Sequence, residues 1–145
     1  MAADFPFSID LNSLQFDQSL RSGNPDIDAE HEQLLHSAQD ILYAASAGKP
    51  TREIQSRLDE LVMAMSRHFA HEDQLMNQSG WSEAEQHAGI HRLLMAEATR
   101  LVEQHRATMA SFLDIYRFVV GTLVRDHLAT HDVEFHHYLQ EQEGN

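Results

Sequence analysis

The chain has 145 residues, 42% of them hydrophobic, which suits one globular domain with a single core. Ten Lys and Arg residues against 23 Asp and Glu residues give a formal net charge of −13, which disfavours nucleic acid or an anionic membrane surface as a partner. The lack of cysteine excludes disulfides, thiolate metal sites and cysteine nucleophiles. No apolar stretch approaches the ~18 residues of a membrane span and no secretory signal is visible, so we expect a cytoplasmic protein without membrane insertion.

Histidine is the unusual component of this sequence. The chain has 11 His alongside only three Pro and six Gly. Few helix breakers and long stretches of Ala, Leu, Glu, Gln, Arg and Met favour helices. Any function assigned to this helical chain must therefore account for its high content of histidine.

The N-terminal segment, residues 1–23, mixes apolar and polar residues without a sustained helical period. We predict that it forms an arm that packs on the body of the protein. Residues 24–145 are predicted to form a single domain. Its first helix covers about 25–48 and begins at Pro25 or one turn later behind Asp28. Its second helix covers about 51–79 and is capped by Thr51.

The second half of the domain contains two further predicted helices. The third begins with Ser82-x-x-Glu85, which has the pattern of a capping box. The fourth begins behind Thr108 or Ser111. Because no segment of convincing length has the two-residue period of a strand, the sequence predicts an all-α fold, an antiparallel up-down-up-down four-helix bundle with short loops.

Each predicted helix carries ionisable residues on its apolar stripe. The pairs in the second and third helices are four residues apart, which places both members on one face. In an antiparallel bundle these positions fall at the same end, where side chains from four helices meet. The residues are His31, His68, Glu72, His87, His91 and His127.

A core of hydrogen-bonded polar residues is the alternative explanation for this set. Burying so many titratable groups without a metal would cost several kcal/mol, which disfavours it. Most of the remaining histidines are assigned to the solvated surface, and only one of the adjacent His136 and His137 can face inward. These histidines are His36, His71, His105, His131, His136 and His137. Asp73, Glu83 and Glu85 are assigned to a helix cap and solvated faces.

The ligand types favour a centre of two metal ions. With Asp132 counted beside Glu72, five imidazoles and two carboxylates exceed the four ligands of a structural zinc site, and carboxylates can bridge two ions. One metal could be held by three histidines and the other by two, with both carboxylates and an oxo or hydroxo group bridging the two metals. This arrangement would leave one metal with an open position. After His127 the spacing itself leaves the next ligand open: His131 is the better partner by helical geometry, and Asp132 is the carboxylate.

The sequence resembles the hemerythrin family in its bacterial single-domain form, from Gly23 through Leu139 and including Phe16-Asp17. Each motif alone is weak, but their order and spacing are specific. Phe16 stands where the family often has Trp, and Asp73 where a second Glu is common. The motifs are Ile27-Asp28-Ala29-Glu30-His31, His68-Phe69-Ala70-His71-Glu72-Asp73-Gln74-Leu75-Met76, His87-x-x-x-His91 and His127-Leu128-Ala129-Thr130-His131-Asp132.

The resemblance implies a non-haem centre of two iron ions with an oxo or hydroxo bridge. It implies that His87, His91 and His127 hold one iron, that His31 and His68 hold the other, and that Glu72 and Asp132 bridge them. It also selects Asp132 over His131, and we infer that the helix widens locally through a π-type turn, which brings residues i and i+5 nearly into line.

The expected function is reversible dioxygen binding in a carrier, storage or delivery protein, and not catalysis. Leu123 and Val124 are expected to line the oxygen pocket beside the iron held by His31 and His68. The alternatives are a diiron enzyme acting on peroxide or nitric oxide, an oxygen sensor that signals to a separate protein, and a structural zinc bundle. The protein that would receive oxygen or a signal is not identified by any motif.

Overall fold

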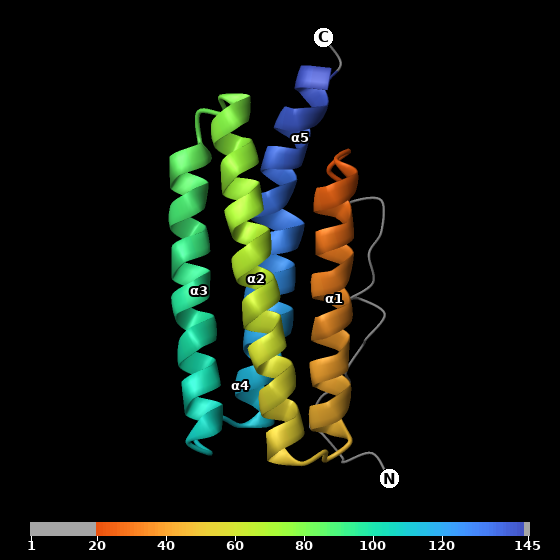
Figure 1. The fold of residues 1–145 in the computed structure, drawn as a ribbon, viewed down its shortest axis with the longest axis vertical. Helices are drawn as coiled ribbons and strands as arrows, with labels where there is room; N and C mark the ends of the chain where they lie inside the picture. The colour runs from red at the N-terminus through yellow and green to blue at the C-terminus, as the bar shows by residue number, and fades with distance from the viewer. Residues whose placement is uncertain (1–19, 144–145) are drawn as a thin grey trace.

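Four antiparallel helical rods form the described part of the protein (Figure 1). The computed structural model describes residues 20–143, so the first 19 residues of the predicted arm lie outside the described part. α4, η3 and α5 follow one another without a break and make up the fourth rod. The predicted all-α, up-down-up-down four-helix bundle is therefore confirmed. The helices are α1 (Pro25–Ser46), α2 (Thr51–Ser79), α3 (Ala84–Arg106), α4 (Phe112–Tyr116), η3 (Arg117–His131) and α5 (Asp132–Glu143).

Side-chain caps fix the starts of the first and fourth rods. Asn24 has an extended backbone, and its Oδ1 accepts hydrogen bonds from the amides of Asp26 and Ile27 at 2.9 and 3.1 Å. Ser111 and Asp114 form a reciprocal capping box, because each side chain accepts a hydrogen bond from the other residue's amide. The structure thus selects Pro25 and Ser111 from the starts that the sequence left open.

The caps predicted for the second and third helices are wrong. Thr51 lies inside the first turn of α2, and Pro50 is the N-cap, whose carbonyl oxygen accepts from the amides of Glu53 and Ile54. α3 begins after Glu83, whose φ of −100° and ψ of 12° lie outside the extended region that a side-chain cap requires. The Ser82-x-x-Glu85 motif therefore forms a turn without a capping box.

The fourth rod contains a long π-helix. Residues 117–131 have this wider winding, and the amide of Asp132 donates to the carbonyl of His127, five residues earlier. The side chain of Thr130 likewise donates to the carbonyl of Arg125 at 3.0 Å. The local widening predicted between His127 and Asp132 is confirmed and extends further along the rod than expected.

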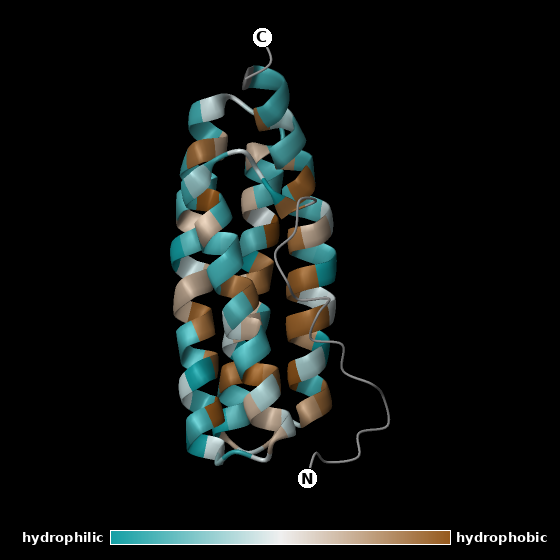
Figure 2. Cartoon of the chain, turned by 90° about the vertical axis from the view of Figure 1, so that its right-hand side faces the viewer, coloured by the Kyte–Doolittle hydropathy of each residue, from teal (hydrophilic) through white to brown (hydrophobic). Residues whose placement is uncertain are grey.

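Two apolar clusters make up the core. The larger contains Phe69 of α2 and Leu128 of η3, and the smaller contains Met76 and Phe135 at the end where α2 meets α3. Glu72 lies between the two clusters on α2, as Asp132 does on the fourth rod. Figure 2 shows hydrophobic and hydrophilic residues alternating along the rods, as expected for helices with one buried face.

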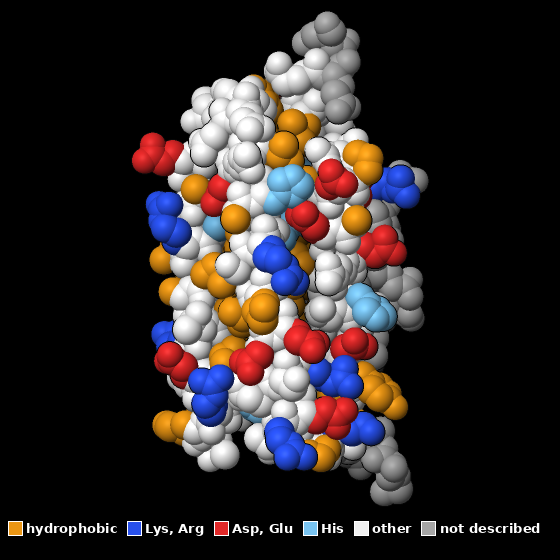
Figure 3. Space-filling model, viewed as in Figure 1, with side chains coloured by type: hydrophobic (Ala, Val, Ile, Leu, Met, Phe, Trp, Pro, Cys, Tyr) orange, Lys and Arg blue, Asp and Glu red, His pale blue; other side chains and the backbone are white. Residues whose placement is uncertain are grey.

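The surface carries mixed charge. Acidic and basic side chains are interspersed over the face shown in Figure 3. Among residues 20–143, none of the helices combines the length and the apolar character that crossing a lipid bilayer would require.

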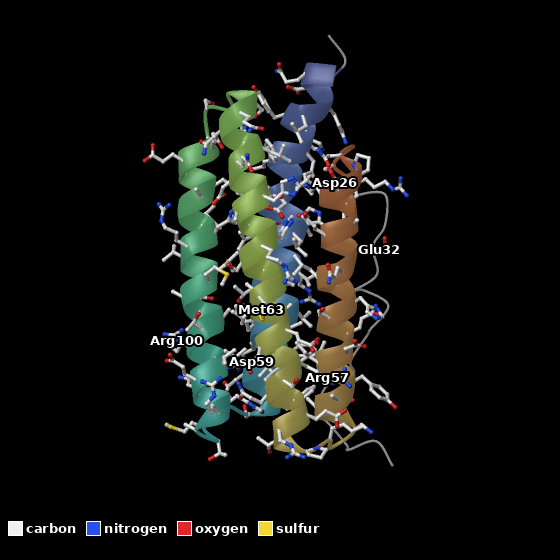
Figure 4. The ribbon with its side chains drawn as sticks, in the orientation of Figure 1. Asp26, Glu32, Arg57, Asp59, Met63 and Arg100 are labelled. Atoms are coloured by element: carbon white, nitrogen blue, oxygen red, sulfur yellow. The ribbon has the colours of Figure 1, made fainter. Side chains whose placement is uncertain are left out.

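Two methionines of α2 differ in burial, so substituting each one shows how much a buried side chain of this helix contributes to the free energy of unfolding. Met65 has no exposed surface, whereas Met63, labelled in Figure 4, is 60% exposed. We expect Met65→Ala to lower the free energy of unfolding by about 2–5 kcal/mol, because it leaves a cavity. Met63→Ala should change it by less than about 0.5 kcal/mol. Urea denaturation followed by circular dichroism measures both values, and equal losses would contradict this assignment of the core.

Candidate metal centre

All seven residues predicted as metal ligands meet in one buried cluster. Every helical rod contributes at least one of them, and none is more than 3% exposed. Their ligand atoms fall into two groups, and within each group all the atoms lie within 4.8 Å of one another. The first group is Glu72, His87, His91, His127 and Asp132, and the second is His31, His68, Glu72 and Asp132.

Three imidazoles face each other in the first group. The Nε2 atoms of His91 and His127 are 3.1 Å apart, and the Nε2 atoms of His87 and His127 each lie 2.9 Å from Oδ1 of Asp132. Oε1 of Glu72 lies 3.2 Å from Nε2 of His91 and 3.4 Å from Nε2 of His87. One oxygen of each carboxylate therefore belongs to the three-histidine group.

The other oxygen of each carboxylate faces the remaining two imidazoles. Nε2 of His31 lies 3.5 Å from Oε2 of Glu72 and 3.2 Å from Oδ2 of Asp132. Nε2 of His68 lies 3.4 Å from the same Glu72 oxygen and 4.0 Å from the same Asp132 oxygen. Glu72 and Asp132 thus each divide their two oxygens between a three-histidine and a two-histidine group.

Several buried atoms of the cluster lack the partners that such atoms need. Among the described residues, both carboxylate oxygens of Glu72, Oδ2 of Asp132, and Nε2 of His31 and His68 make no hydrogen bond. Buried polar groups left in this state are costly and rare in native proteins. A metal ion is the partner that imidazole nitrogens and carboxylate oxygens share, so the donor set fits a metal site.

Two acidic residues outside the cluster hold the histidine rings in place. Nδ1 of His68 donates to Glu30 at 2.8 Å, and Nδ1 of His91 donates to Asp73 at 2.7 Å. This arrangement places the proton on Nδ1 and leaves Nε2 free to bind a metal. Glu30 was not singled out from the sequence, and Asp73 was assigned to a solvated face. The only sequence signal for either was its position beside a predicted ligand, His31 and Glu72 respectively.

The π-helix brings Asp132 into the cluster in place of His131. Asp132 is fully buried, whereas His131 is half-buried and belongs to neither ligand group. Because Asp132 follows His127 at the five-residue spacing of a π turn, both side chains reach the same point.

The buried carboxylates and imidazoles shift one another's pKa values. Burial raises the pKa of Asp132, but His127 and the other facing imidazoles outweigh it and hold that pKa well below its usual range. Burial lowers the pKa of His31 and of His87, but Asp132 and Glu72 outweigh it and raise both values to about 9. In the absence of metal, protons on the imidazoles balance the two carboxylates.

The surface assignment is wrong for two of the other histidines. His105 is buried, and its Nδ1 donates to Oε1 of Gln55 at 2.7 Å. His136 is 1% exposed, and burial, followed by the nearby His31, lowers its pKa to about 4. Both could have been found from helical spacing, since His105 continues the buried stripe of α3 and His136 lies four residues after Asp132. His36 and His137 are exposed as predicted.

The two residues expected to line an oxygen pocket lie in the larger apolar cluster. Leu123 and Val124 of η3 are both buried there. Their contact with a bound oxygen molecule stays a prediction.

A surface cavity reaches one residue of the cluster. It has a volume of about 270 Å³ and is lined by His87, Trp81 and His131 together with the carboxylates of Glu83 and Glu134. His87, a member of the three-histidine group, therefore borders a surface cavity whose lining also includes two acidic residues.

A helical bundle with a His, Glu and Asp cluster in its core belongs to the class of bundles that hold metal ions between their helices. The chain is 22% identical over 130 residues to a bacteriohemerythrin of Campylobacter jejuni, a match that covers 89% of this chain and 98% of the relative. It is 29% identical over 112 residues to bacteriohemerythrins of Pseudomonas paraeruginosa and Pseudomonas aeruginosa, covering 77% of this chain and 70% of each relative. No family model matches the chain. These relatives and this cluster together support a hemerythrin-family protein.

Glu30 and Glu32 provide a matched test of the residues that orient the histidines. Glu30 contacts His68, whereas Glu32, labelled in Figure 4, is exposed on the same helix. We expect Glu30→Ala to weaken metal affinity by about 10–100-fold, because His68 loses the acceptor that fixes its Nδ1 proton. Glu32→Ala should leave the affinity unchanged. Competition with a chelator measures both, and equal affinities in the two variants would contradict the role of Glu30.

The raised histidine pKa values predict a pH-dependent stability of the metal-free protein. His31 and His87 shift from about 6.5 when unfolded to about 9 when folded, so between these values the folded state binds more protons. Their contribution is complete below pH 6.5 and is lost as the pH rises to 9. We expect the urea midpoint of the metal-free protein to fall between pH 7 and pH 9. The metal-loaded protein is the control and should change less. A midpoint of the metal-free protein that stays constant over this range would refute the expectation.

Proposed function

We propose that the protein holds two iron ions in the buried cluster and binds dioxygen reversibly, as an oxygen carrier, storage or delivery protein and not as an enzyme. The division of the Glu72 and Asp132 oxygens between the two histidine groups carries this proposal. Two carboxylates that each face both groups suit a pair of ions that they bridge. The name bacteriohemerythrin carried by the relatives supports the same function.

The two halves of the proposed centre have unequal numbers of protein ligands. His87, His91 and His127 would hold one iron, and His31 and His68 would hold the other, with Glu72 and Asp132 shared. The three-histidine group has five residues and the two-histidine group has four. An open position for a small molecule is therefore expected on the two-histidine side. When bound, the two ferrous ions supply the electrons for reversible dioxygen binding.

An aromatic ring packs against two imidazoles of the three-histidine group. The ring of Phe69 stacks on His91 with centroids 4.1 Å apart and planes inclined by 8°, and its edge faces His127 at 5.2 Å. Leu123 and Val124 of η3 are buried in the larger apolar cluster, to which Phe69 also belongs. Apolar surroundings that restrict water and protons favour the reversible loss of bound oxygen over its further reduction.

Iron content and the response to oxygen test the proposal together. We expect two iron ions per chain and a visible absorption band that appears when oxygen is added to the reduced protein and disappears when it is removed. Irreversible oxidation with turnover of peroxide or nitric oxide would instead indicate an enzyme. A zinc content without iron would indicate a structural site. The cytoplasmic location and any protein that receives oxygen or a signal stay predictions.

Two aspartates of the fourth rod provide matched variants for this experiment. Asp132 is fully buried in the cluster, whereas Asp126 is exposed beside His127. We expect Asp132→Asn to lower the iron content below two per chain and to abolish the reversible band, because a bridging carboxylate is lost. Asp126→Asn should retain both. Full iron content and a normal band in Asp132→Asn would refute the bridging role.

A further inference from the structure

His136 is a buried imidazole without a partner. It is 1% exposed, and neither ring nitrogen makes a hydrogen bond to any residue that the structure describes. A neutral imidazole carries one N–H donor and one acceptor nitrogen, and burying both unsatisfied costs free energy. Buried polar groups in native proteins nearly always have a partner, so this side chain calls for one from outside the described residues.

His136 lies on the two-histidine side of the cluster. It follows Asp132 by four residues on α5, which places both on the same helix face. Its ring centroid is 5.2 Å from that of His31, compared with 4.5 Å between His31 and His68. The unpartnered imidazole therefore borders the half of the centre that has fewer protein ligands.

The position of His136 separates it from the residues that would bind metal. It belongs to neither of the two groups whose ligand atoms lie within 4.8 Å of one another. A side chain just outside such a group, and next to its open side, is placed to contact a molecule that the metal binds. Its sequence neighbour His137 is exposed and shares none of these features.

We propose that His136 donates a hydrogen bond from its ring N–H to a small molecule bound on the two-histidine side of the centre. The inference rests on the proposed diiron function. It adds a polar contact to the oxygen pocket, which the sequence predicts to be lined by the apolar residues Leu123 and Val124. The ligand class is a molecule of two or three atoms with a terminal lone pair, of which dioxygen and azide are examples. His136 thereby sets the affinity and lifetime of the bound molecule.

Azide binding to the oxidised, iron-loaded protein tests this role. Absorbance titrations give the azide affinity of the parent protein and of the variants His136→Leu, His136→Gln and His137→Leu, and metal analysis gives their iron content. We expect His136→Leu to keep two iron ions and to bind azide about tenfold more weakly, since it loses a hydrogen bond to a charged ligand. His136→Gln should recover part of the affinity, and His137→Leu should match the parent.

The outcomes separate this proposal from the one on which it rests. Equal azide affinity in the parent and in His136→Leu would overturn the role of His136 alone. Loss of iron from both His136→Leu and His136→Gln would also overturn it, because His136 would then be a ligand. A parent protein that takes up no iron or binds no azide would overturn both proposals. Circular dichroism checks folding, and we expect no loss of structure in His136→Leu, since an apolar side chain replaces an unsatisfied polar one.

Discussion

Two carboxylates without exposed surface lie among five imidazoles, and the bundle is arranged around this concentration of buried charge. Ionised groups of this kind are stable inside a protein only when partners surround them closely. No single helix can provide such partners, because one helix face offers side chains only every three or four residues. The four rods together can, and each of them places at least one member of the cluster at the same level.

The geometry of the partners depends on features away from the cluster itself. The π-helix turns Asp132 toward His127, and Glu30 and Asp73 fix the rings of His68 and His91 from behind. Apolar clusters lie on both sides of the charged layer along α2 and the fourth rod. Because these neighbours keep water out, the interactions within the cluster are stronger than they would be at the surface.

Periodic features of the sequence predicted most of the fold and of the candidate site. Breakers such as Gly80 marked helix ends, and the apolar stripes placed His31 and His87 on inward faces at one end of the bundle. Features that depend on backbone dihedral angles or on a partner in another helix were harder to predict. Thr51 and Ser82 have capping residue types, yet Thr51 lies inside α2 behind Pro50, and the backbone of Glu83 at the start of α3 is not extended as a side-chain cap needs.

The hydrogen-bond partner of Glu30 could not be predicted, because it lies on another helix. Glu30 precedes His31 in the sequence but bonds to His68 on α2, and only the packing of the two helices shows this. His105 and His136 illustrate a different difficulty. Their spacing was compatible with burial, but a histidine on a helix is more often solvated, so residue type outweighed position in the assignment to the surface.

The unequal sizes of the two apolar clusters bear on how metal reaches the site. Among the described residues, the cluster beyond the charged layer has three buried members, Met76, Ala84 and Phe135, with Trp81 and Tyr138 packed against it. Segments with few buried apolar contacts open at low free energy while the rest of a protein stays folded. This end of the bundle is therefore expected to open locally before the larger core does. Such transient opening would let ions enter a folded bundle, so that metal uptake would not have to occur during folding.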